Sequence, residues 1–186
     1  MKENIVQHKN NKVLYIILTA LFAALSAALS QLAVPINAVP IVFTQVSIFL
    51  AAGLLGWRWG TLSQLLFAVM GAIGLPVFAG MRGGWAYVVG PTGGFILGYI
   101  LAALAVGLLL HRFGRSFKVV LPALLLGTLI IYLPGLPWLA HVTNMTSLRD
   151  AFLFGMLPYL PGDLLKVALC SALIPKLYQL LHNKLQ

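Results

Sequence analysis

Charged residues are scarce in this sequence, and acidic residues are the scarcest of them. Asp, Glu, Lys and Arg make up 8% of its 186 residues, with 12 basic and 3 acidic side chains, whereas 61% of the residues are hydrophobic. A soluble domain contains about 25% charged residues. Because so few charges cannot cover a water-facing surface, the apolar residues must face lipid or one another. The composition therefore excludes a separate soluble domain and predicts a membrane protein.

The groups that enzymes and metal proteins need are also missing. Three acidic residues leave little material for a pair of catalytic carboxylates, and the four histidines are dispersed without metal-ligand spacing. There is no G-x-x-x-x-G-K-S/T phosphate loop and no G-x-S-x-G or H-E-x-x-H motif. The lone cysteine, Cys170, lies in an apolar run and cannot form an intrachain disulfide. We therefore expect no enzymatic activity, no metal, no cofactor and no ATP site in this chain.

Long apolar stretches, separated by glycine and proline, dominate what is present. A membrane span needs roughly 20 mostly apolar residues, and such stretches follow one another along nearly the whole chain. We predict an all-α polytopic membrane protein in which residues 1–186 form a single membrane domain. The six predicted spans are at about 13–34, 40–56, 60–78, 93–111, 118–140 and 155–181. Glycine and proline predict breaks between them, including breaks at 56–60 and 134–137.

The basic residues lie at the ends of these spans, singly or in pairs. This distribution is typical of topology signals and does not form a phosphate-binding stripe, so nucleic acid is not an expected partner despite the net charge of +9. With six spans, the side of the termini holds Lys2, Lys9, Lys12, Arg58, Arg112, Arg115, Lys118, Lys176 and Lys184. The other side holds Arg82 and Arg149. Both termini are therefore predicted to be cytoplasmic, with the loops at 35–40, 79–92 and 141–154 outside.

A charge pair interrupts the last apolar stretch. Asp163 and Lys166 lie three residues apart in Pro161-Gly162-Asp163-Leu164-Leu165-Lys166, so both project from one face of a helix. If the span starts near 155, Lys166 lies about 16 Å along it, near mid-membrane. Charges at that depth usually pair and mark a ligand site or a pathway. The alternative is an ion pair that only ties helices together.

The predicted outward loop at 79–92 is rich in glycine and aromatic residues. Glycines such as Gly83 let backbone N–H groups approach a ligand closely. Trp85 and Tyr87 can stack on an apolar ring, and Arg82 is a natural partner for a carboxylate. We interpret this loop as a ligand lid. The alternative is a flexible loop whose aromatic side chains lie at the membrane interface.

Two further features have weaker signals. Ala20, Ala24 and Ala28 are spaced four apart in the first span, and such a ridge of small residues lets another helix approach closely. That helix can belong to this chain or to a partner. Gln45, with Thr44 and Asn37 nearby, lies at the outer end of the second span, where it can bind a ligand's polar edge or act as a loop and capping residue.

Two long motifs resemble a known family. The first runs from Gly74-Leu75-Pro76-Val77-Phe78-Ala79-Gly80 through Arg82-Gly83-Gly84 to Gly90-Pro91-Thr92-Gly93-Gly94-Phe95-Ile96-Leu97-Gly98-Tyr99, and the second is Tyr159-Leu160-Pro161-Gly162-Asp163-Leu164-Leu165-Lys166. Both are similar to the signature of the BioY family, the biotin-binding S components of energy-coupling-factor (ECF) transporters. The resemblance covers essentially the whole chain in length and number of spans.

The resemblance implies a fold, a substrate and partners. It implies six helices with cytoplasmic termini in a bacterial plasma membrane, and an outward-facing site for one biotin. It also implies high-affinity capture by this chain, with transport driven by a transmembrane coupling protein and two ATPase subunits that alone use ATP. Small residues on the first helix dock the coupling protein in related S components, and Ala20, Ala24 and Ala28 match that pattern.

The chemistry of biotin suggests a role for each candidate residue. Asp163 is expected to accept from the ureido N–H groups, and Lys166 to pair with Asp163 and donate to the ureido carbonyl. Trp85 and Tyr87 are expected to cover the rings, while Arg82, N–H groups of the glycine loop or Gln45 hold the carboxylate. The reverse pose, with Lys166 on the carboxylate, remains an alternative. So do a self-sufficient biotin carrier and an S component for another small vitamin.

Overall fold

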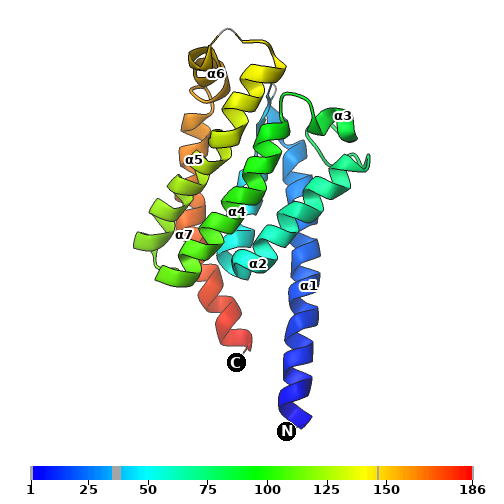
Figure 1. The fold of residues 1–186 in the computed structure, drawn as a ribbon. Coiled ribbons are helices and arrows are strands. Elements are labelled where there is room, and N and C mark those ends of the chain that lie inside the picture. Colours follow the sequence, from blue (N-terminus) through cyan, green and yellow to red (C-terminus); the bar gives the residue numbers. More distant parts are fainter. Residues whose placement is uncertain (1, 35–38, 146, 186) are drawn as a thin grey trace.

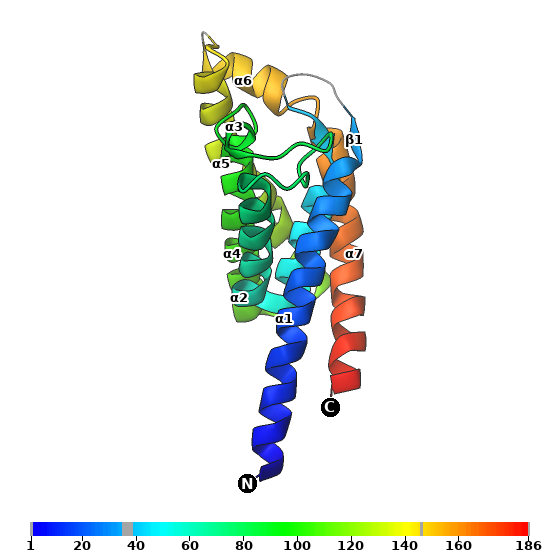
Figure 2. The same cartoon turned by 90° about the vertical axis from the view of Figure 1, so that its right-hand side faces the viewer.

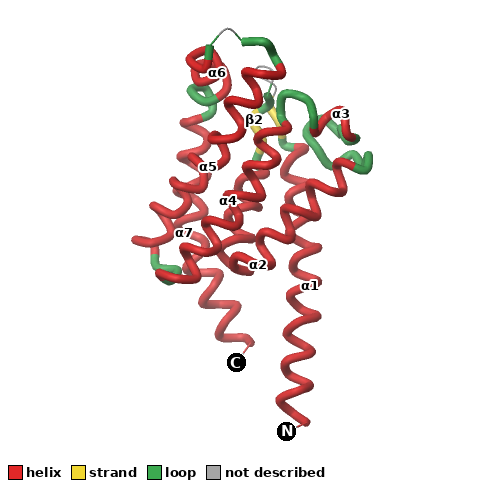
Figure 3. The backbone as a smooth tube through the Cα atoms, in the orientation of Figure 1, coloured by secondary structure: helices red, strands yellow, loops and turns green. Residues whose placement is uncertain are grey.

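The structure is a computed structural model that describes residues 2–34, 39–145 and 147–185. These residues are mostly helical, as predicted, and the helices run along one long axis (Figures 1 and 3). The elements are α1 (Lys2–Gln31), β1 (Ala33–Val34), β2 (Ile41–Val42), α2 (Thr44–Ala72), α3 (Trp85–Val88), α4 (Gly93–Phe113), α5 (Phe117–Val142), α6 (Leu148–Gly155) and α7 (Leu160–Leu185). Asn37 lies outside the described residues.

Four helical segments in the described part of the chain are long and apolar enough to cross a membrane. They are Lys12–Gln31, Gly93–Phe113, Phe117–Val142 and Leu160–Leu181. They match the predicted first, fourth, fifth and sixth spans. The predicted second and third spans, 40–56 and 60–78, overlap α2 but extend beyond both of its ends, since α2 runs from Thr44 to Ala72. Its parts 44–55 and 57–72 are each shorter than the roughly 20 residues of a full span.

A sharp turn divides α2 into two arms. Gly56 has φ 78° and ψ −176°, which is outside the helical region and which a residue with a Cβ adopts only with strain. Figure 1 shows the two arms meeting near the lower end of the bundle and diverging from there. The predicted break at 56–60 is therefore present as a turn at Gly56 between two helical arms, 44–55 and 57–72. Because of this turn, the first arm of α2 runs down to the lower end of the bundle and the second arm runs back up (Figure 1).

Two predicted boundaries are wrong. Pro134 and Pro137 do not end a helix but lie within α5. Packed neighbouring helices can compensate for the hydrogen bonds that proline removes. The last helix begins at Leu160 and not near 155, because a turn at 156–159 separates it from the short helix α6. Lys166 is therefore about 9 Å along α7 at 1.5 Å per residue, closer to the end of that helix than expected.

The short sheet also differs from the prediction. The segments at 33–34 and 41–42, expected as parts of the first two spans, form antiparallel strands in which Ala33 pairs with Val42 and Val34 with Ile41. The strand β2 leads directly into α2. This pair of short strands therefore holds together the two ends of the connection between α1 and α2.

A buried polar cluster joins α1 to both arms of α2. The Ser26 hydroxyl lies 2.9 Å from the Ser47 hydroxyl and 3.2 Å from Oε1 of Gln64. Ser47 also donates to the carbonyl oxygen of Phe22 at 3.1 Å. Each of these polar side chains is fully buried, and hydrogen bonds in such surroundings are costly to lose. The cluster therefore fixes the rotation of α1 against the bundle.

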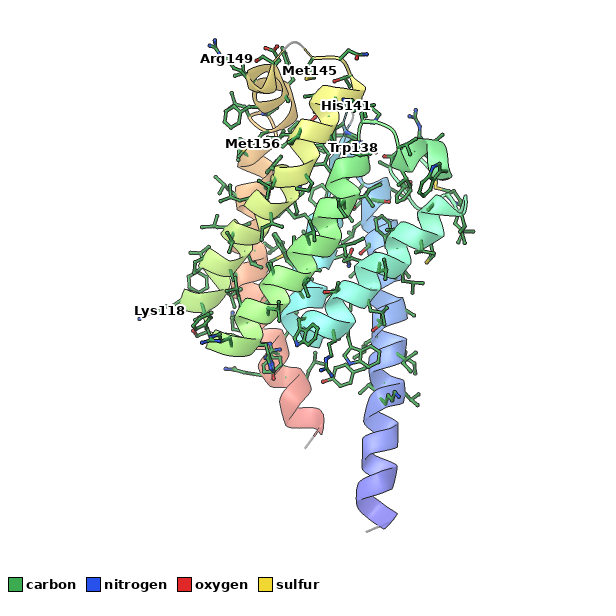
Figure 4. All side chains as sticks on the ribbon, in the orientation of Figure 1. Lys118, Trp138, His141, Met145, Arg149 and Met156 are labelled. Carbon is green, nitrogen blue, oxygen red and sulfur yellow. The ribbon has the colours of Figure 1, made fainter. Side chains whose placement is uncertain are left out.

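Both termini lie at the same end of the molecule (Figure 2). Figure 4 places Lys118 toward that end, and His141 and Arg149 at the opposite end. Lys118 and Arg149, which the predicted topology assigns to opposite sides of the membrane, thus lie toward opposite ends of the molecule. The end that holds α3, α6 and the strands is called the upper end below, as in Figure 1.

Candidate functional site

A cavity that is partly open to solvent lies near the upper end, between the segment that enters α2 and helices α4, α5 and α7. Its empty space is about 420 Å³, which includes the part open to solvent. Most of its wall is apolar or aromatic, with a few polar side chains that converge on it. The lining residues are Val39, Pro40, Ile41, Val42, Gln45, Phe95, Tyr99, Ile131, Tyr132, Gly155, Tyr159, Asp163 and Lys166.

The predicted charge pair forms the polar part of this cavity. Nζ of Lys166 lies 2.9 Å from Oδ1 of Asp163, and the residues are 6% and 7% exposed. The same ammonium group donates to the carbonyl oxygen of Val42 at 2.8 Å. The other carboxylate oxygen of Asp163 accepts a hydrogen bond of 2.5 Å from the Tyr132 hydroxyl. Each charge is therefore paired and hydrogen-bonded, as buried charges require.

The start of α7 explains why these groups point into the cavity. Asp163 lies in the first turn of α7, where a negative side chain is favoured by the helix dipole. One turn earlier, the Tyr159 hydroxyl donates to the carbonyl oxygen of Val39 at 2.5 Å. Because Tyr159 and Lys166 both bond to the segment that precedes α2, they hold this segment against α7 and close that side of the cavity.

Gln45 enters the cavity from α2. It is 5% exposed, and its Nε2 donates to the Thr128 hydroxyl at 3.0 Å. Thr128 in turn donates to the carbonyl oxygen of Leu124, one turn earlier in α5. The predicted residues Gln45, Asp163 and Lys166, from two separate helices, are thus brought together around one cavity.

A second cavity of about 360 Å³ adjoins the first. The two share Val39, Pro40, Val42, Phe95 and Tyr99 in their walls. The second cavity is mostly apolar, and Phe67, Phe78 and Tyr87 add aromatic side chains to its wall. Its wall includes Thr44, a residue that is 1% exposed and whose hydroxyl has no hydrogen-bond partner among the residues described. Together the two cavities offer an ion pair at one end and an aromatic compartment at the other.

The glycine-rich loop contributes to the site only in part. Tyr87, from α3, stacks on Phe78 with ring centroids 4.8 Å apart and lines the second cavity. Burial raises the pKa of Tyr87 above its ordinary value, so the phenol stays protonated and can donate. Trp85 is 67% exposed and Arg82 is also exposed, and neither lines a cavity. The structure therefore does not bring these two predicted residues to the site.

Gly83 belongs to the same loop but has a packing role in this structure. A Cβ at this position would lie 2.1 Å from the carbonyl oxygen of Leu75. Only glycine allows the two backbone segments to approach so closely. Gly83 thus shapes the loop, and it does not line either cavity.

The alanine ridge of α1 divides into two faces. Ala20, Ala24 and Ala28 are exposed, whereas Ala23 is fully buried against the bundle. The predicted ridge therefore points away from this chain's own helices. Its surface remains free to contact another helix or lipid.

Several cavity residues had no signal that identified them in the sequence. Tyr132 lies in an apolar run, and its partner Asp163 is 31 residues away. Phe95 and Tyr99 lie within the longer family motif without a chemical pattern of their own, and Tyr159 begins the shorter one. A tyrosine in an otherwise apolar span is the one available clue, because a buried hydroxyl needs a partner.

These features define the protein as a helical membrane protein with two adjoining cavities near its upper end. Its sequence identifies it further: the chain belongs to the BioY family, whose model matches residues 2–183. The resemblance of the two motifs to this family is thereby confirmed.

Known proteins of the same family resemble the chain over most of its length. A probable biotin transporter BioY from Pyrococcus horikoshii is 40% identical over 81% of this chain and 88% of the relative. The biotin transporter BioY from Thermotoga maritima is 34% identical over 89% of this chain and 96% of the relative. A crystal structure of the S-component for biotin from an ECF-type ABC transporter matches with a TM-score of 0.84 and 30% identity, covering 91% of this chain and 93% of that one.

Proposed function

We propose that this protein captures biotin with high affinity and serves as the substrate-binding S component of an ECF-type ABC transporter. The observation that carries the proposal is the buried Asp163–Lys166 pair, which lines a cavity near the upper end in a chain of the BioY family. The names of its relatives and the fold that it shares with a biotin S component support the same substrate.

The free hydrogen-bonding capacity of the pair suits the ureido group of biotin. The Asp163 carboxylate accepts from Lys166 and Tyr132, and a carboxylate has about four acceptor sites. It can therefore also accept from a ureido N–H. Lys166 donates to Asp163 and Val42, which leaves one of its three N–H groups for the ureido carbonyl. The reverse pose would place the biotin carboxylate on Lys166.

The apolar part of biotin has suitable surroundings in both cavities. Phe95 and Tyr99 line the two cavities where they adjoin, and Tyr87 lines the second. The sulfur ring would contact these aromatic side chains, with Gln45 or the glycine loop holding the valerate carboxylate. Arg82 and Trp85 would take part after a further closure of the loop over the bound ligand.

A six-span topology fits the fold. The spans would be α1, the two arms of α2, α4, α5 and α7, with both termini in the cytoplasm of a bacterial cell. The excess of Lys and Arg on the side of the termini supports this orientation. The two cavities would then open toward the outside, where biotin is captured.

The energy for uptake would come from partner subunits. The chain has no phosphate-binding loop, so a transmembrane coupling protein and two ATPases would drive transport. The exposed ridge of Ala20, Ala24 and Ala28 is the proposed docking surface, because small residues allow close helix contact in a membrane.

Uptake of labelled biotin in a host without its own biotin transporter tests this assignment. The chain is expressed alone, with an intact ECF module, or with a module whose ATPases are inactive. We expect uptake only with the intact module. ATPase-independent uptake would contradict the S-component role and favour a self-sufficient carrier, whereas uptake of a different vitamin would redirect the substrate assignment.

A further inference from the structure

Side chains in the last helical turn of α1 form hydrogen bonds with the loop at 77–82, which is far away in the sequence. Nε2 of Gln31 lies 3.2 and 3.0 Å from the carbonyl oxygens of Val77 and Phe78. Oε1 of the same side chain accepts from the backbone N–H of Met81 at 2.9 Å. The buried Ser30 hydroxyl also donates to the carbonyl oxygen of Val77. Two adjacent side chains of α1 therefore bind both sides of the turn at 77–82, and this arrangement is called the α1 clasp below.

The turn that the α1 clasp holds is strained. Gly80 and Met81 have φ values of 73° and 57°, so two consecutive residues adopt the left-handed conformation. This conformation is unfavourable for methionine, which carries a Cβ. Phe78 and Arg82 close the turn by exchanging backbone hydrogen bonds of 2.9 and 3.2 Å. Strained turns of this kind persist only where their surroundings hold them in place, and Gln31 bonds directly to the strained residue Met81.

The same turn forms part of the wall of the second cavity. Phe78 and Ala79 line this cavity and are buried, whereas Gly80, Met81 and Arg82 are exposed. The Phe78 ring packs on Tyr87 and, edge to face, on Phe67 at 5.4 Å. A displacement of the turn would therefore pull the Phe78 ring off both neighbours and open the aromatic compartment at the upper end.

We propose that Ser30 and Gln31 are positioning residues that keep the Phe78 wall closed and so set how long a ligand stays in the site. Ser30 also lines the second cavity, whereas Gln31 lines neither. Both are proposed to act through the backbone of 77–81 and not through direct recognition of the ligand. The part of the proposal that concerns biotin rests on the proposed function. The clasp also links the cavity wall to α1, so a movement of α1 at its upper end changes the closure of the site.

Biotin dissociation from Gln31→Met tests the effect on retention. Methionine keeps the length of the side chain but removes its hydrogen bonds to Val77, Phe78 and Met81. We expect dissociation to be about tenfold faster or more, the size expected from the loss of these bonds, with a smaller change in the association rate. Ser26→Ala is the matched control, since it removes buried hydrogen bonds between α1 and α2 away from both cavities. We expect it to lower thermal stability without changing the dissociation rate.

A second measurement needs no ligand. A cysteine at Ala79, in a Cys170→Ala background, reports whether the wall is closed, because Ala79 is 9% exposed. We expect slow maleimide labelling with Gln31 or with Ser26→Ala, and labelling at least about tenfold faster with Gln31→Met, for the same loss of hydrogen bonds. Equal labelling rates for the wild type and Gln31→Met would overturn the proposal that the α1 clasp keeps the wall closed. Equal acceleration of biotin dissociation by Gln31→Met and Ser26→Ala would overturn it as well. A wild-type chain that does not bind biotin would overturn the proposed function and leave this labelling result to decide the α1 clasp alone.

Discussion

The Tyr132 hydroxyl donates to Asp163 across the first cavity, from α5 to α7, at 2.5 Å. The other carboxylate oxygen of Asp163 is bound by Lys166 on its own helix. The carboxylate is thereby fixed from two directions, and its remaining acceptor sites are directed by protein groups before any ligand arrives. Such preorganisation reduces the entropy that a ligand must lose on binding. In the proposed function, biotin recognition and the contact between α5 and α7 would depend on the same carboxylate.

Asp163→Asn removes the negative charge while keeping the shape of the side chain. It leaves the buried ammonium group of Lys166 without its counter-charge, and breaking a buried pair in this way costs about 3–5 kcal/mol of the free energy of unfolding. We expect biotin affinity to fall by about a hundredfold, or about 2.7 kcal/mol, because the ligand loses its hydrogen bond to a charged group and such bonds contribute about 1.5–3 kcal/mol. Calorimetric titration in detergent measures this, and Asp150→Asn on α6 is the matched control.

A double variant separates recognition from helix packing. Asp163→Leu combined with Lys166→Met removes both charges, and apolar replacement of a whole buried pair is often neutral or stabilising. We expect a folded protein with a thermal midpoint close to that of the wild type and without measurable biotin binding. Retained binding in this double variant would show that the ion pair only joins helical turns.

Tyr132→Phe tests the hydrogen bond between the Tyr132 hydroxyl and Asp163. The ring and its edge-to-face contact with Phe95 remain, whereas the donor to Asp163 is lost. Hydrogen bonds to charged groups contribute about 1.5–3 kcal/mol, so we expect affinity to fall about tenfold. Tyr15→Phe, which makes the same chemical change on α1 beside Trp59, is expected to bind normally. Equal losses in the two variants would contradict a specific role for Tyr132.

Ala24→Leu tests the exposed ridge of α1. A larger side chain there would prevent close approach of a partner helix without touching either cavity. We expect normal biotin binding by the isolated chain and strongly reduced co-purification with the coupling protein. Ala168→Leu makes the same change at an exposed position of α7 and should assemble normally. Normal assembly of Ala24→Leu would exclude the ridge as the docking surface.

Gly71→Ala tests how the second cavity is built. A Cβ at position 71 would lie 2.0 Å from the ring of Phe78, so the ring or α2 must move. Overpacking of this kind costs about 1–3 kcal/mol, and we expect a lower thermal midpoint together with faster biotin dissociation. At Gly162 a Cβ would meet no atom within 4 Å, so Gly162→Ala in α7 is expected to leave the thermal midpoint unchanged or raise it. A wild-type midpoint for Gly71→Ala would contradict the tight packing of Phe78.

The sequence predicted best the features that follow from one local rule. Hydropathy located four spans, and the glycine cluster beginning at Gly56 located the turn between the arms of α2. Helical spacing placed Asp163 and Lys166 on one face, and the structure brings them to a cavity with Gln45. Their roles in binding remain predictions.

Features that depend on distant contacts could not be predicted in this way. Nothing near Tyr132 indicates its partner on α7, and nothing near Gln31 indicates that it binds the turn at 77–82. The prolines at 134 and 137 were misread because their effect depends on neighbouring helices. Arg82 and Trp85 were grouped with the site from their composition alone, whereas the fold leaves both exposed.

The most direct test of biotin capture is a calorimetric titration of the purified chain alone, in detergent and without any ATPase subunit. We predict saturable binding of one biotin per chain, because the two cavities adjoin and a single Asp163–Lys166 pair supplies the charged groups there. Folded protein that releases no heat of binding and shows no thermal stabilisation at saturating biotin would contradict the proposal that this chain is the biotin-binding component.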